Sequence, residues 1–470
     1  MSIAPINPDK AAKKEKKKKK NGGVKITPEY IEEQRRLAQI RKQQKALEKQ
    51  QNGQEQPIEE AKNAQFIKRP ILWLDDSPSE NVTLKIMTYN LLAQSLIRRS
   101  LFPTSGEALK WNNRSAVLLQ EIQFYNPDIM CLQEVDAIQF QSFWKLEFEK
   151  MGYHHEYYRY GKKNHGVAII YSKKYFQKSS TIKYINYDDV ESYPVQARTK
   201  TTNVGLVMKL DFNEGVKCGR QGMVIGTHHL FWHPHGTFER TRQTYATLKM
   251  FLEFLNDQNL KAEDYYHFFC GDFNAEPYHS PYLSMTRKPV YYDDVAKSVI
   301  EESVTQIFSD GPDKAPEEPV DDPDKPKYTA AAIGAPKGVP TTSSGTVNAE
   351  LIKNLIKIHN ELPMRAISLY SVGYQAVHPE NSTYRNEPDF SNWAHTWRGL
   401  LDYIFVISPW DITSTKHDVD TVQELQVNEG IKLKGLLRMP PRSEMPDEGL
   451  PRTGDYGSDH LCMVGVVELV

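Results

Sequence analysis

The sequence predicts a layered α/β domain between Leu84 and Val470. In this part of the chain, short apolar runs alternate with longer segments of helical period, which is the pattern of helices packed on β-sheets. Two segments, RSAVLLQEIQFY and RTRQTYATLKMFLEFLN, repeat apolar residues at the spacing of a helix laid on a sheet. The expected strands are the eight apolar runs LKIMTYN, DIMCLQE, GVAIIYS, NVGLVMKL, GMVIGTHHL, HFFCGDFN, LDYIFVI and LCMVGVVEL.

Two segments of biased composition fall outside this pattern. Residues 1–65 form a lysine-rich leader that we expect to be disordered, with a helix start signal at Thr27 that is typical of a solvated helix. Its run Lys13–Lys20 suits a solubilising tail, a nuclear address or a phosphate-binding arm. Residues 309–347, rich in Pro, Asp, Glu, Gly and Ser, are expected to be a disordered insertion, after which NAELIKNLIKIHNEL restarts helical structure. We therefore expect one folded domain over residues 66–470.

Charge and cysteine content restrict the class of protein. The chain of 470 residues has 59 Lys+Arg and 60 Asp+Glu, a net charge of −1, so any binding of nucleic acid has to be local. No run approaches the ~18 apolar residues of a membrane helix, and the amino terminus lacks a hydrophobic signal region, so we expect a soluble protein without a membrane partner. Buried, reduced thiols and an intracellular location, in cytoplasm or nucleus, are expected from four widely spaced cysteines, Cys131, Cys218, Cys270 and Cys462.

Several of the expected strands end in a residue that can bind metal or phosphate. For any single one of them a helix cap or a turn explains the residue equally well. Together they would gather at one edge of the sheets, where like charges repel unless a cation lies among them. Oxygen and amide ligands without cysteine favour Mg²⁺, or Mn²⁺, over Zn²⁺. The set comprises Asn90, Glu134, His228, His229, Asp272, Asn274, Asp402, Asp459 and His460.

The motifs LQE, THHL, GDFN, LDYIF and SDH, in this order, resemble the endonuclease/exonuclease/phosphatase superfamily. Within it, HHLFWHPHGTFERTRQ, GDFNAEP and TWRGLLDYIF resemble the nocturnin and carbon-catabolite-repressor deadenylases, and most strongly the fungal Ngl-type RNA exonucleases, over residues 66–470. The resemblance implies a four-layer α/β sandwich of two mixed, largely antiparallel sheets flanked by helices. It also implies a Mg²⁺-dependent 3′→5′ exoribonuclease that releases 5′-mononucleotides from single-stranded RNA, with a role in 3′-end maturation of 5.8S ribosomal RNA.

The resemblance also assigns the metal ligands and the groups that act on water. Glu134 would be the principal metal carboxylate, with Asn90 beside it and Asp459 completing the metal or hydrogen-bond shell. Asp272 would orient or deprotonate the attacking water, and Asn274 would bind the scissile phosphate. A divalent ion together with amide donors stabilises the negative charge that develops during phosphodiester hydrolysis.

Histidines complete the implied catalytic set. His460 would stabilise the phosphorane charge and would be oriented by Asp402. His229 falls where the family has its phosphate-contacting histidine, but His228 replaces a threonine of the family pattern. Alternation along a strand allows only one of the adjacent pair to face the site, and the sequence leaves open which one does.

Substrate contacts follow from the same resemblance. Pro234 and Trp397 match positions that sandwich a base, although Trp397 is equally explained as a core or rim aromatic. His165 in KNHG would line the cleft. Arg240 and Arg242 open a helix and would touch phosphate or, equally well, form a surface ion pair.

Other functions compete with an exoribonuclease acting on RNA. The same metal centre would serve a poly(A)-specific deadenylase or a phosphatase for a dinucleotide 2′-phosphate. A catalytically silent scaffold is disfavoured because no catalytic position named above is lost. No leucine-rich repeat precedes the domain, so we expect no docking to a deadenylase complex by that route, and we expect a monomer.

Overall fold

The computed structural model describes residues 66–261, 263–309, 337–339, 345–395 and 397–470. The predicted leader and most of the predicted insertion lie outside these residues. At the borders of the insertion, strand β10 (Ile307–Ser309) pairs with β11 (Lys337–Val339), and helix α9 (Gly345–Asn360) begins before the predicted restart at Asn348. Over the part of the chain that the structure describes, no helix is both long and apolar enough to cross a membrane.

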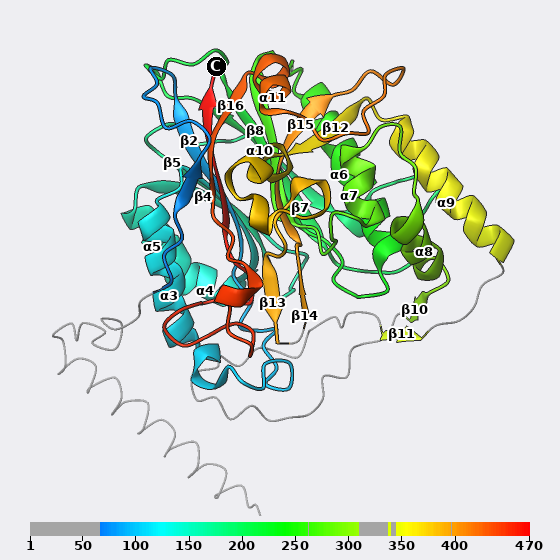
Figure 1. Cartoon of the computed structure of the whole chain (residues 1–470), viewed down its shortest axis with the longest axis horizontal. Coiled ribbons are helices and arrows are strands. Elements are labelled where there is room, and N and C mark those ends of the chain that lie inside the picture. Colours follow the sequence, from blue (N-terminus) through cyan, green and yellow to red (C-terminus); the bar gives the residue numbers. More distant parts are fainter. Residues whose placement is uncertain (1–65, 262, 310–336, 340–344, 396) are drawn as a thin grey trace, which may run out of the picture. The chain divides into compact units, whose positions relative to one another are not determined.

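Two mixed sheets form the centre of the fold (Figure 1). In each of them one neighbouring pair is parallel, β2 with β3 and β8 with β9, and the other neighbours are antiparallel. In spatial order, the first sheet has seven strands: β1 (Ile71–Trp73), β16 (Ile431–Leu437), β17 (Met463–Leu469), β2 (Thr83–Asn90), β3 (Ile129–Asp136), β5 (His165–Ser172) and β4 (Tyr153–Tyr158). The second has six: β12 (Met364–Ser368), β15 (Asp402–Pro409), β9 (Tyr265–Asp272), β8 (Gly222–His229), β7 (Val204–Asp211) and β6 (Ile182–Asn186).

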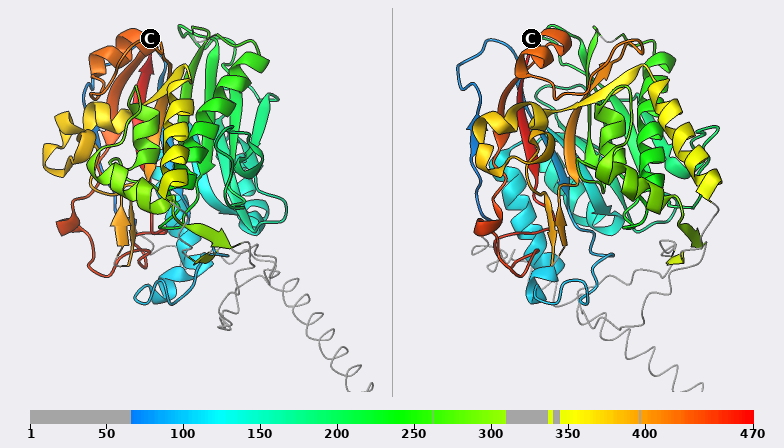
Figure 2. Two further views of the ribbon diagram at one scale, coloured as in Figure 1. Left: turned by 90° about the vertical axis from the view of Figure 1, so that its right-hand side faces the viewer. Right: turned by 45° about the vertical axis from the view of Figure 1, so that its right-hand side comes forward.

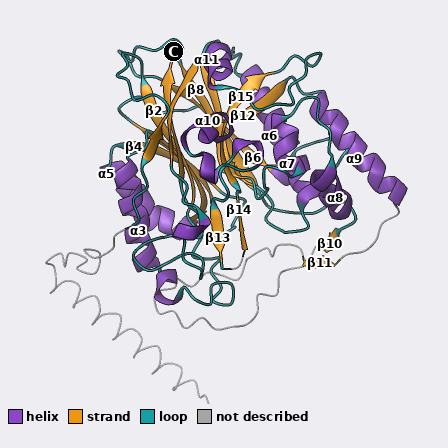
Figure 3. Ribbon diagram, in the orientation of Figure 1, coloured by secondary structure: helices purple, strands orange, loops and turns teal. Residues whose placement is uncertain are grey.

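Helices cover the outer face of each sheet, as Figures 2 and 3 show. On the first sheet lie α3 (Trp111–Tyr125) and a continuous helix made of α4 (Ala137–Gln139), a π turn (Phe140–Trp144) and α5 (Lys145–Lys150). On the second lie α6 (Thr237–Asp257), α7 (Ser280–Thr286), α8 (Asp294–Ser303) and α9. The remaining elements are α10 (Leu369–Val377), α11 (Val422–Glu429), the hairpin of β13 (Asn392–Ala394) and β14 (Trp397–Gly399), and 3-10 turns at Gly106–Leu109, Tyr187–Asp189, Pro379–Asn381, Tyr384–Asn386 and Arg442–Glu444.

Alternation along the strands creates two apolar layers. In β2, Leu84 and Ile86 pack into the core between the sheets, whereas Met87 and Tyr89 pack against α3. Successive side chains of a strand point to opposite faces, so a strand buried on both faces appears in sequence as a continuous apolar run. The predicted four-layer α/β sandwich of two mixed, largely antiparallel sheets is therefore confirmed.

Candidate active site

The polar ends of five strands meet at one edge of the two sheets. In the second sheet, Asp272 at the end of β9 is the register partner of both His229 in β8 and Asp402 in β15. In the first sheet, β2 and β3 run parallel, so Asn90 at the end of β2 and Glu134 near the end of β3 lie at the same edge of that sheet. The sequence expectation that these groups converge agrees with their placement.

A β-bulge aims Glu134 at this edge. The pairing of β3 with β5 shifts between Leu132 and Val135, and Glu134 inside the shift has a φ of 52°, in the left-handed region. A non-glycine residue in that region is strained, and bulges are commonly used to redirect a side chain. The carboxylate is then held on both oxygens: Oε2 accepts from the backbone N–H of Ala93 at 2.9 Å, and Oε1 accepts from Asn90 Nδ2 at 3.3 Å.

Asn90 joins the two sheets through its amide. Its Nδ2 also donates to Oδ2 of Asp272 at 2.9 Å, while its Oδ1 accepts from the backbone N–H of Leu92 at 3.0 Å. These partners fix which end of the amide faces the carboxylates. Glu134 of one sheet and Asp272 of the other therefore share one donor and lie in one pocket.

A short hydrogen bond ties His460 to Asp402. His460 Nδ1 lies 2.7 Å from Oδ2 of Asp402, and the same oxygen accepts from Ser391 Oγ at 2.6 Å. The other ring nitrogen, Nε2, lies 3.8 Å from Oδ2 of Asp272. Asp402 thus fixes the ring so that Nε2 faces the shared pocket.

Burial and mutual charge shift the pKa values of these groups. Burial and the nearby Asp402 raise the pKa of Asp272 to about 7, against the lowering influence of His460 and of the Asn90 amide. Burial by itself would lower the pKa of His460, but the carboxylates of Asp402, Asp272 and Asp459 outweigh it and raise the pKa to about 10. The imidazole is therefore a cation at neutral pH, while Asp272 exchanges its proton near neutrality.

His229 faces the site as a neutral ring. Its Nε2 lies 3.6 Å from Oδ2 of Asp272 and 3.9 Å from Oε1 of Glu134. Burial, with the cations Lys163 and His460 nearby, lowers its pKa to about 3. These contacts are thus not ion pairs, and Nε2 is available to a phosphate oxygen.

His228 points to the opposite face of β8. Its Nδ1 lies 2.8 Å from Tyr187 Oη and 3.1 Å from Thr247 Oγ1, under helix α6. Burial holds its pKa well below the usual value. The question left open by the sequence is settled by the register of β8: His229 faces the acidic residues and His228 belongs to the core.

Two further predicted residues border the carboxylates. The backbone carbonyl of Asp459 accepts from Trp393 N–H at 2.8 Å, and burial, with Glu134 nearby, raises the pKa of its side chain. Asn274 has a left-handed φ of 48°, its N–H donates to Oδ1 of Asp272 at 2.8 Å, and its Nδ2 donates to the carbonyl of Leu230 at 3.0 Å. Asn274 is thereby held against Asp272, and the Asp459 carboxyl lies near Glu134.

His165 and Lys163 lie at the same edge. The ring of His165, the first residue of β5, lies 6.3 Å from that of His229, and burial together with Lys163 keeps its pKa well below the ordinary value. Lys163 donates to the carbonyl of Thr202 at 3.3 Å and interacts electrostatically with Glu134. The Lys163 ammonium is a positive charge at the candidate site that the sequence analysis did not identify, although Lys163 stands two residues before His165.

The donor set fits a hard divalent cation. Four carboxylates, of Glu134, Asp272, Asp402 and Asp459, gather with Asn90 in a largely buried space, and Oδ1 of Asp402 has no hydrogen-bond partner in the described structure. Like charges so placed repel one another unless a cation is bound. All of these ligand atoms are oxygens, which Mg²⁺, Mn²⁺ and Ca²⁺ prefer.

One arrangement of acidic and histidine ligands is compact enough to hold an ion by itself. In Asp272, Asp402 and His460, one ligand atom from each lies within 4.8 Å of the other two. The hydrogen bond between Asp402 and His460 already uses one of these carboxylate oxygens and Nδ1 of the ring. The carboxylates of Glu134 and Asp459 are therefore better suited to a metal.

The predicted substrate residues lie farther out. Pro234 is exposed and Trp397 on β14 is 52% exposed, so Trp397 is not a core aromatic. The interpretation of Arg240 and Arg242 as surface or phosphate-binding residues is wrong, because both are buried. Arg240 donates to the carbonyls of residues 231, 233 and 234, and Arg242 forms an ion pair with Glu239 at 2.7 Å.

Two serines that support the site were also missed. Ser391 binds Asp402, and Ser458 donates to the carbonyl of Asn90 at 2.7 Å and bonds the backbone N–H of His460 at 3.2 Å. The motif SDH contains Ser458 and offered a signal for it. Ser391 precedes the β13–β14 hairpin without any motif of its own.

A sequence model of the Endonuclease/Exonuclease/phosphatase family matches residues 87–460, which include every predicted metal and catalytic residue. The chain belongs to the endonuclease/exonuclease/phosphatase family. A family of this kind implies a divalent metal, and the oxygen-rich site described above is compatible with one.

Members of this family similar to the chain include RNA exonucleases. RNA exonuclease NGL2 of Saccharomyces cerevisiae is 48% identical over 424 residues, covering 86% of this chain and 82% of that protein. The CCR4-Not complex 3′-5′-exoribonuclease subunit Ccr4 of Candida glabrata is 28% identical over 221 residues, 42% of this chain and 25% of that protein. The crystal structure of ANGEL2, a 2′,3′-cyclic phosphatase, superposes with a TM-score of 0.54 at 20% identity, covering 86% of this chain and 99% of that one. The structural likeness supports the four-layer fold.

Proposed function

We propose that this chain is a Mg²⁺-dependent 3′→5′ exoribonuclease that hydrolyses the 3′ ends of single-stranded RNA to 5′-mononucleotides. The observation that carries the proposal is the convergence of Glu134, Asn90, Asp272 and His460 in one pocket, joined by the Asn90 amide. It is supported by the 48% identity to an RNA exonuclease over most of both chains. We further propose that residues 66–470 are the catalytic domain, that the protein is a monomer in the cytoplasm or nucleus, and that its substrate is a precursor of 5.8S ribosomal RNA.

In this proposal Glu134 and Asp459 hold the metal, and Asn90, predicted as a further ligand, positions Glu134 through its Nδ2 while its Oδ1 accepts from Leu92 N–H. Their oxygens border the pocket from the first sheet and from the segment before β17. A bound Mg²⁺ supplies positive charge that neutralises the phosphate and polarises its oxygens. Asn90 also holds the carboxylates of Glu134 and Asp272, which belong to different sheets, next to each other through the hydrogen bonds of its amide.

Asp272 acts on the attacking water. Its Oδ1 is held by the backbone N–H of Asn274, and its Oδ2 faces His460 and His229. A carboxyl group with a pKa of about 7 accepts a proton from water more readily than an ordinary aspartate does, because basicity rises with pKa. Asn274, fixed by its bond to Leu230, offers its remaining amide hydrogen to the scissile phosphate.

The histidines stabilise the charge that develops on phosphorus. His460 is held as a cation by Asp402 and directs Nε2–H into the pocket, where equatorial oxygens become more negative. His229 presents a neutral ring to the same oxygens. Pro234 and Trp397 hold the terminal base, and His165 lines the wall beside His229.

Product ladders on end-labelled RNA test this function. Wild-type protein is incubated with a poly(A) 3′ tail, a 5.8S-like 3′ extension and a dinucleotide 2′-phosphate, each with Mg²⁺ and with a chelator. We expect Mg²⁺-dependent shortening from the 3′ end, loss of at least about 10²-fold in rate for Glu134→Gln, and no release of phosphate from the dinucleotide. Preference for poly(A) would identify a deadenylase, phosphate release would identify a small-molecule phosphatase, and undiminished activity in chelator would refute the metal mechanism.

A further inference from the structure

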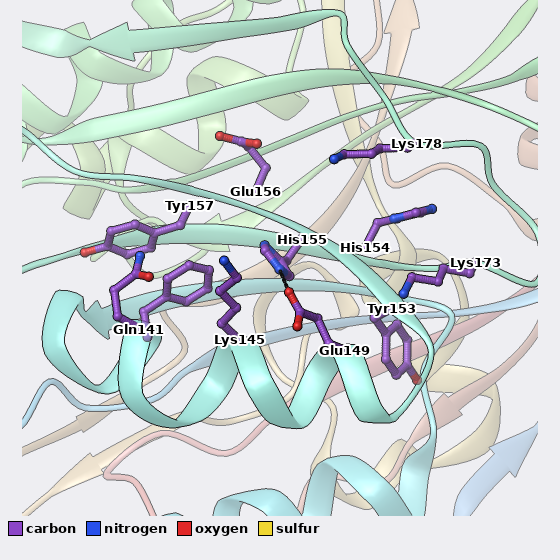
Figure 4. A pocket seen from close by; sticks show the side chains of 11 residues that line it. Gln141, Lys145, Glu149, Tyr153, His154, His155, Glu156, Tyr157, Lys173 and Lys178 are labelled. Atoms are coloured by element: carbon purple, nitrogen blue, oxygen red, sulfur yellow. Dashed lines mark hydrogen bonds and ion pairs between the residues drawn. The ribbon is translucent and has the colours of Figure 1, made fainter.

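A groove outside the candidate active site runs along a free edge of the seven-stranded sheet. Strand β4 is the last strand of that sheet, and the groove lies between it and the continuous helix Ala137–Lys150 (Figure 4). Its volume is about 660 Å³. Side chains from both faces of β4 line it, because the groove follows the strand's unpaired edge.

Three lysines that form no hydrogen bond or ion pair among the described residues give this groove a positive charge. Lys145 rises from α5 towards β4, and Lys173 and Lys178 come from the segment that follows β5 (Figure 4). In the described structure no hydrogen bond or ion pair engages the side-chain nitrogen of any of the three. Other lysines of the fold are paired, such as Lys150 of α5 with Glu147 at 2.8 Å and Lys183 of β6 with Asp257 at 3.2 Å.

The two glutamates of the groove are already engaged. Glu149 bonds His155 Nε2 at 3.2 Å, and Glu156 accepts from Tyr184 Oη at 2.7 Å. A second histidine, His154, faces Lys173 and Lys178, whose charges together with burial lower its pKa. Glu149 also interacts electrostatically with Lys145 and Lys173, and the groove holds three lysines against two carboxylates, so it has a net positive charge that suits an anion.

One end of the groove reaches the strand that carries Glu134. Tyr157 Oη donates to the carbonyl of Val135 at 3.2 Å, and the ring of Tyr157 stacks on Phe140 at 4.6 Å. Val135 follows Glu134 directly in β3. From Tyr157 to Tyr153, β4 extends the groove away from the site by ~13 Å at the usual rise of a strand.

We propose that this groove binds phosphates of the RNA strand on the 5′ side of the scissile bond. The proposal rests on the exoribonuclease function proposed above and extends it, because Lys145, Lys173 and Lys178 become a second, sequence-independent contact with substrate. Lysines that contact phosphate release counterions, which makes binding dependent on salt. Single-stranded RNA fits this surface better than an acidic peptide does, since Tyr157 at one end of the groove bonds the carbonyl of Val135, the residue that follows Glu134.

Binding and cleavage by a triple variant test the proposal. Lys145→Gln, Lys173→Gln and Lys178→Gln are combined, and the matched control combines Lys297→Gln, Lys353→Gln and Lys357→Gln on α8 and α9, which removes the same charge from exposed positions elsewhere. Fluorescence anisotropy, measured with a chelator present, gives the Kd of a labelled single-stranded RNA of roughly 20 nucleotides. This RNA is longer than the ~4–16 nucleotides that one OB fold covers. Circular dichroism and Tm verify that both variants are folded.

The groove variant is expected to bind the RNA about tenfold more weakly, with a salt slope lower by about 2, since each lost contact with single-stranded nucleic acid removes about 0.7. Its kcat/KM for this RNA, relative to that for a trinucleotide, should fall by a similar factor, while the control matches wild type. The same Kd and the same salt slope for the two variants would overturn the proposal. So would a competition experiment in which polyglutamate displaces the labelled RNA as effectively as unlabelled RNA does. Absence of cleavage by wild type would refute the proposed function, yet the binding result would still decide the role of the groove.

Discussion

Replacing Asp402 by asparagine isolates the charge that keeps His460 protonated. Asparagine has the size of aspartate, and its carbonyl oxygen accepts the Nδ1–H bond that Oδ2 accepts in the wild type at 2.7 Å. The side chain is fully buried, so water does not screen the loss of charge. The substitution therefore changes the electrostatics of the ring while retaining its orientation.

The size of the effect follows from the pKa of His460. That pKa is about 10, against an ordinary value of 6.5, and a difference of this size corresponds to a free energy on the order of 5 kcal/mol. Without the Asp402 carboxylate, burial dominates and the pKa falls towards or below the ordinary value. The ring is then largely neutral at pH 8, and losing one preorganised donor to the transition state typically costs about 10²–10³ in kcat.

The assay is the pH dependence of kcat/KM on a labelled RNA between pH 5 and pH 9. Wild-type activity should show no loss from His460 over this range, since its proton leaves only near pH 10. Relative to wild type at the same pH, Asp402→Asn should lose about 10²–10³-fold at pH 8 and recover part of that loss as the pH falls, whereas the wild-type rate itself falls below about pH 7 as Asp272 takes up a proton. Glu387→Gln is the matched control, because Glu387 is a buried carboxyl bonded to Tyr282 at 2.8 Å.

Two results would refute this reasoning. If Asp402→Asn lost activity equally at every pH, orientation and not charge would be the contribution of Asp402. If Glu387→Gln produced the same profile, the effect would reflect loss of a buried carboxylate in general. Ser391→Ala, which removes the 2.6 Å bond to Asp402 but keeps the charge, should reduce the rate without moving the profile.

The remaining predictions concern stability, the histidine pair and the exposed tryptophan. The pKa of Asp272 is about 7 in the folded protein and 3.8 ordinarily, so the folded state keeps a proton that the unfolded chain has lost, and the free energy of unfolding falls as pH rises through this window. Bound Mg²⁺ favours the carboxylate, so calorimetry should show a larger increase in Tm with Mg²⁺ at pH 8 than at pH 5, and equal increases would contradict the assignment. His229→Ala should lower kcat by about 10²-fold with little change in Tm, whereas His228→Ala should lower the free energy of unfolding by about 1–3 kcal/mol, because it leaves a cavity in the core and removes one of the two hydrogen bonds of Tyr187 Oη, which keeps only Thr247 Oγ1 as a partner. A loss of activity for His228→Ala together with a loss of stability for His229→Ala would contradict the placement of His229 in the site. Trp397→Ala should weaken RNA binding by about 1–3 kcal/mol, seen as a higher KM with little change in Tm, and an unchanged KM would exclude stacking.

The strands that sequence analysis predicts are those buried on both faces. All eight expected runs form strands of the two large sheets, because such strands need apolar residues at successive positions. Five strands of these sheets were missed: β1, β4, β6, β12 and β16. β4, with the sequence YHHEYY, and β6, with IKYIN, are each the last strand of a sheet and partly exposed, so their polar residues conceal the pattern. β12 is buried but only five residues long, and two lysines interrupt the apolar run of β16.

The candidate site was predictable in its membership more than in its geometry. Glu134 and Asp272 end apolar runs, and strand ends of one sheet edge gather in space. Which of His228 and His229 faces them depends on the register of β8 against β9, which composition does not encode. The bulge at Glu134 likewise arises from the pairing of β3 with β5.

Arg240 and Arg242 show why charged residues mislead sequence reasoning. Both were expected at the surface, where charge is most often solvated. Arg240 instead binds carbonyls of the segment that follows β8, and Arg242 binds Glu239 and the carbonyl of Tyr187. Backbone carbonyls are present at every position, so no sequence pattern marks them as partners.

The net charge of −1 conceals a separation of charge that matters for catalysis. Four carboxylates gather at the candidate site, with the Lys163 ammonium and the His460 imidazolium beside them, whereas Lys145, Lys173 and Lys178 line the groove along β4. Under the two proposals made above, the carboxylates repel the 3′ end of an RNA until a cation occupies the site, while the groove attracts the body of the strand. The metal would then govern entry of the 3′ end as well as the chemistry, because the groove holds RNA at a separate surface and leaves that dependence on the metal unchanged.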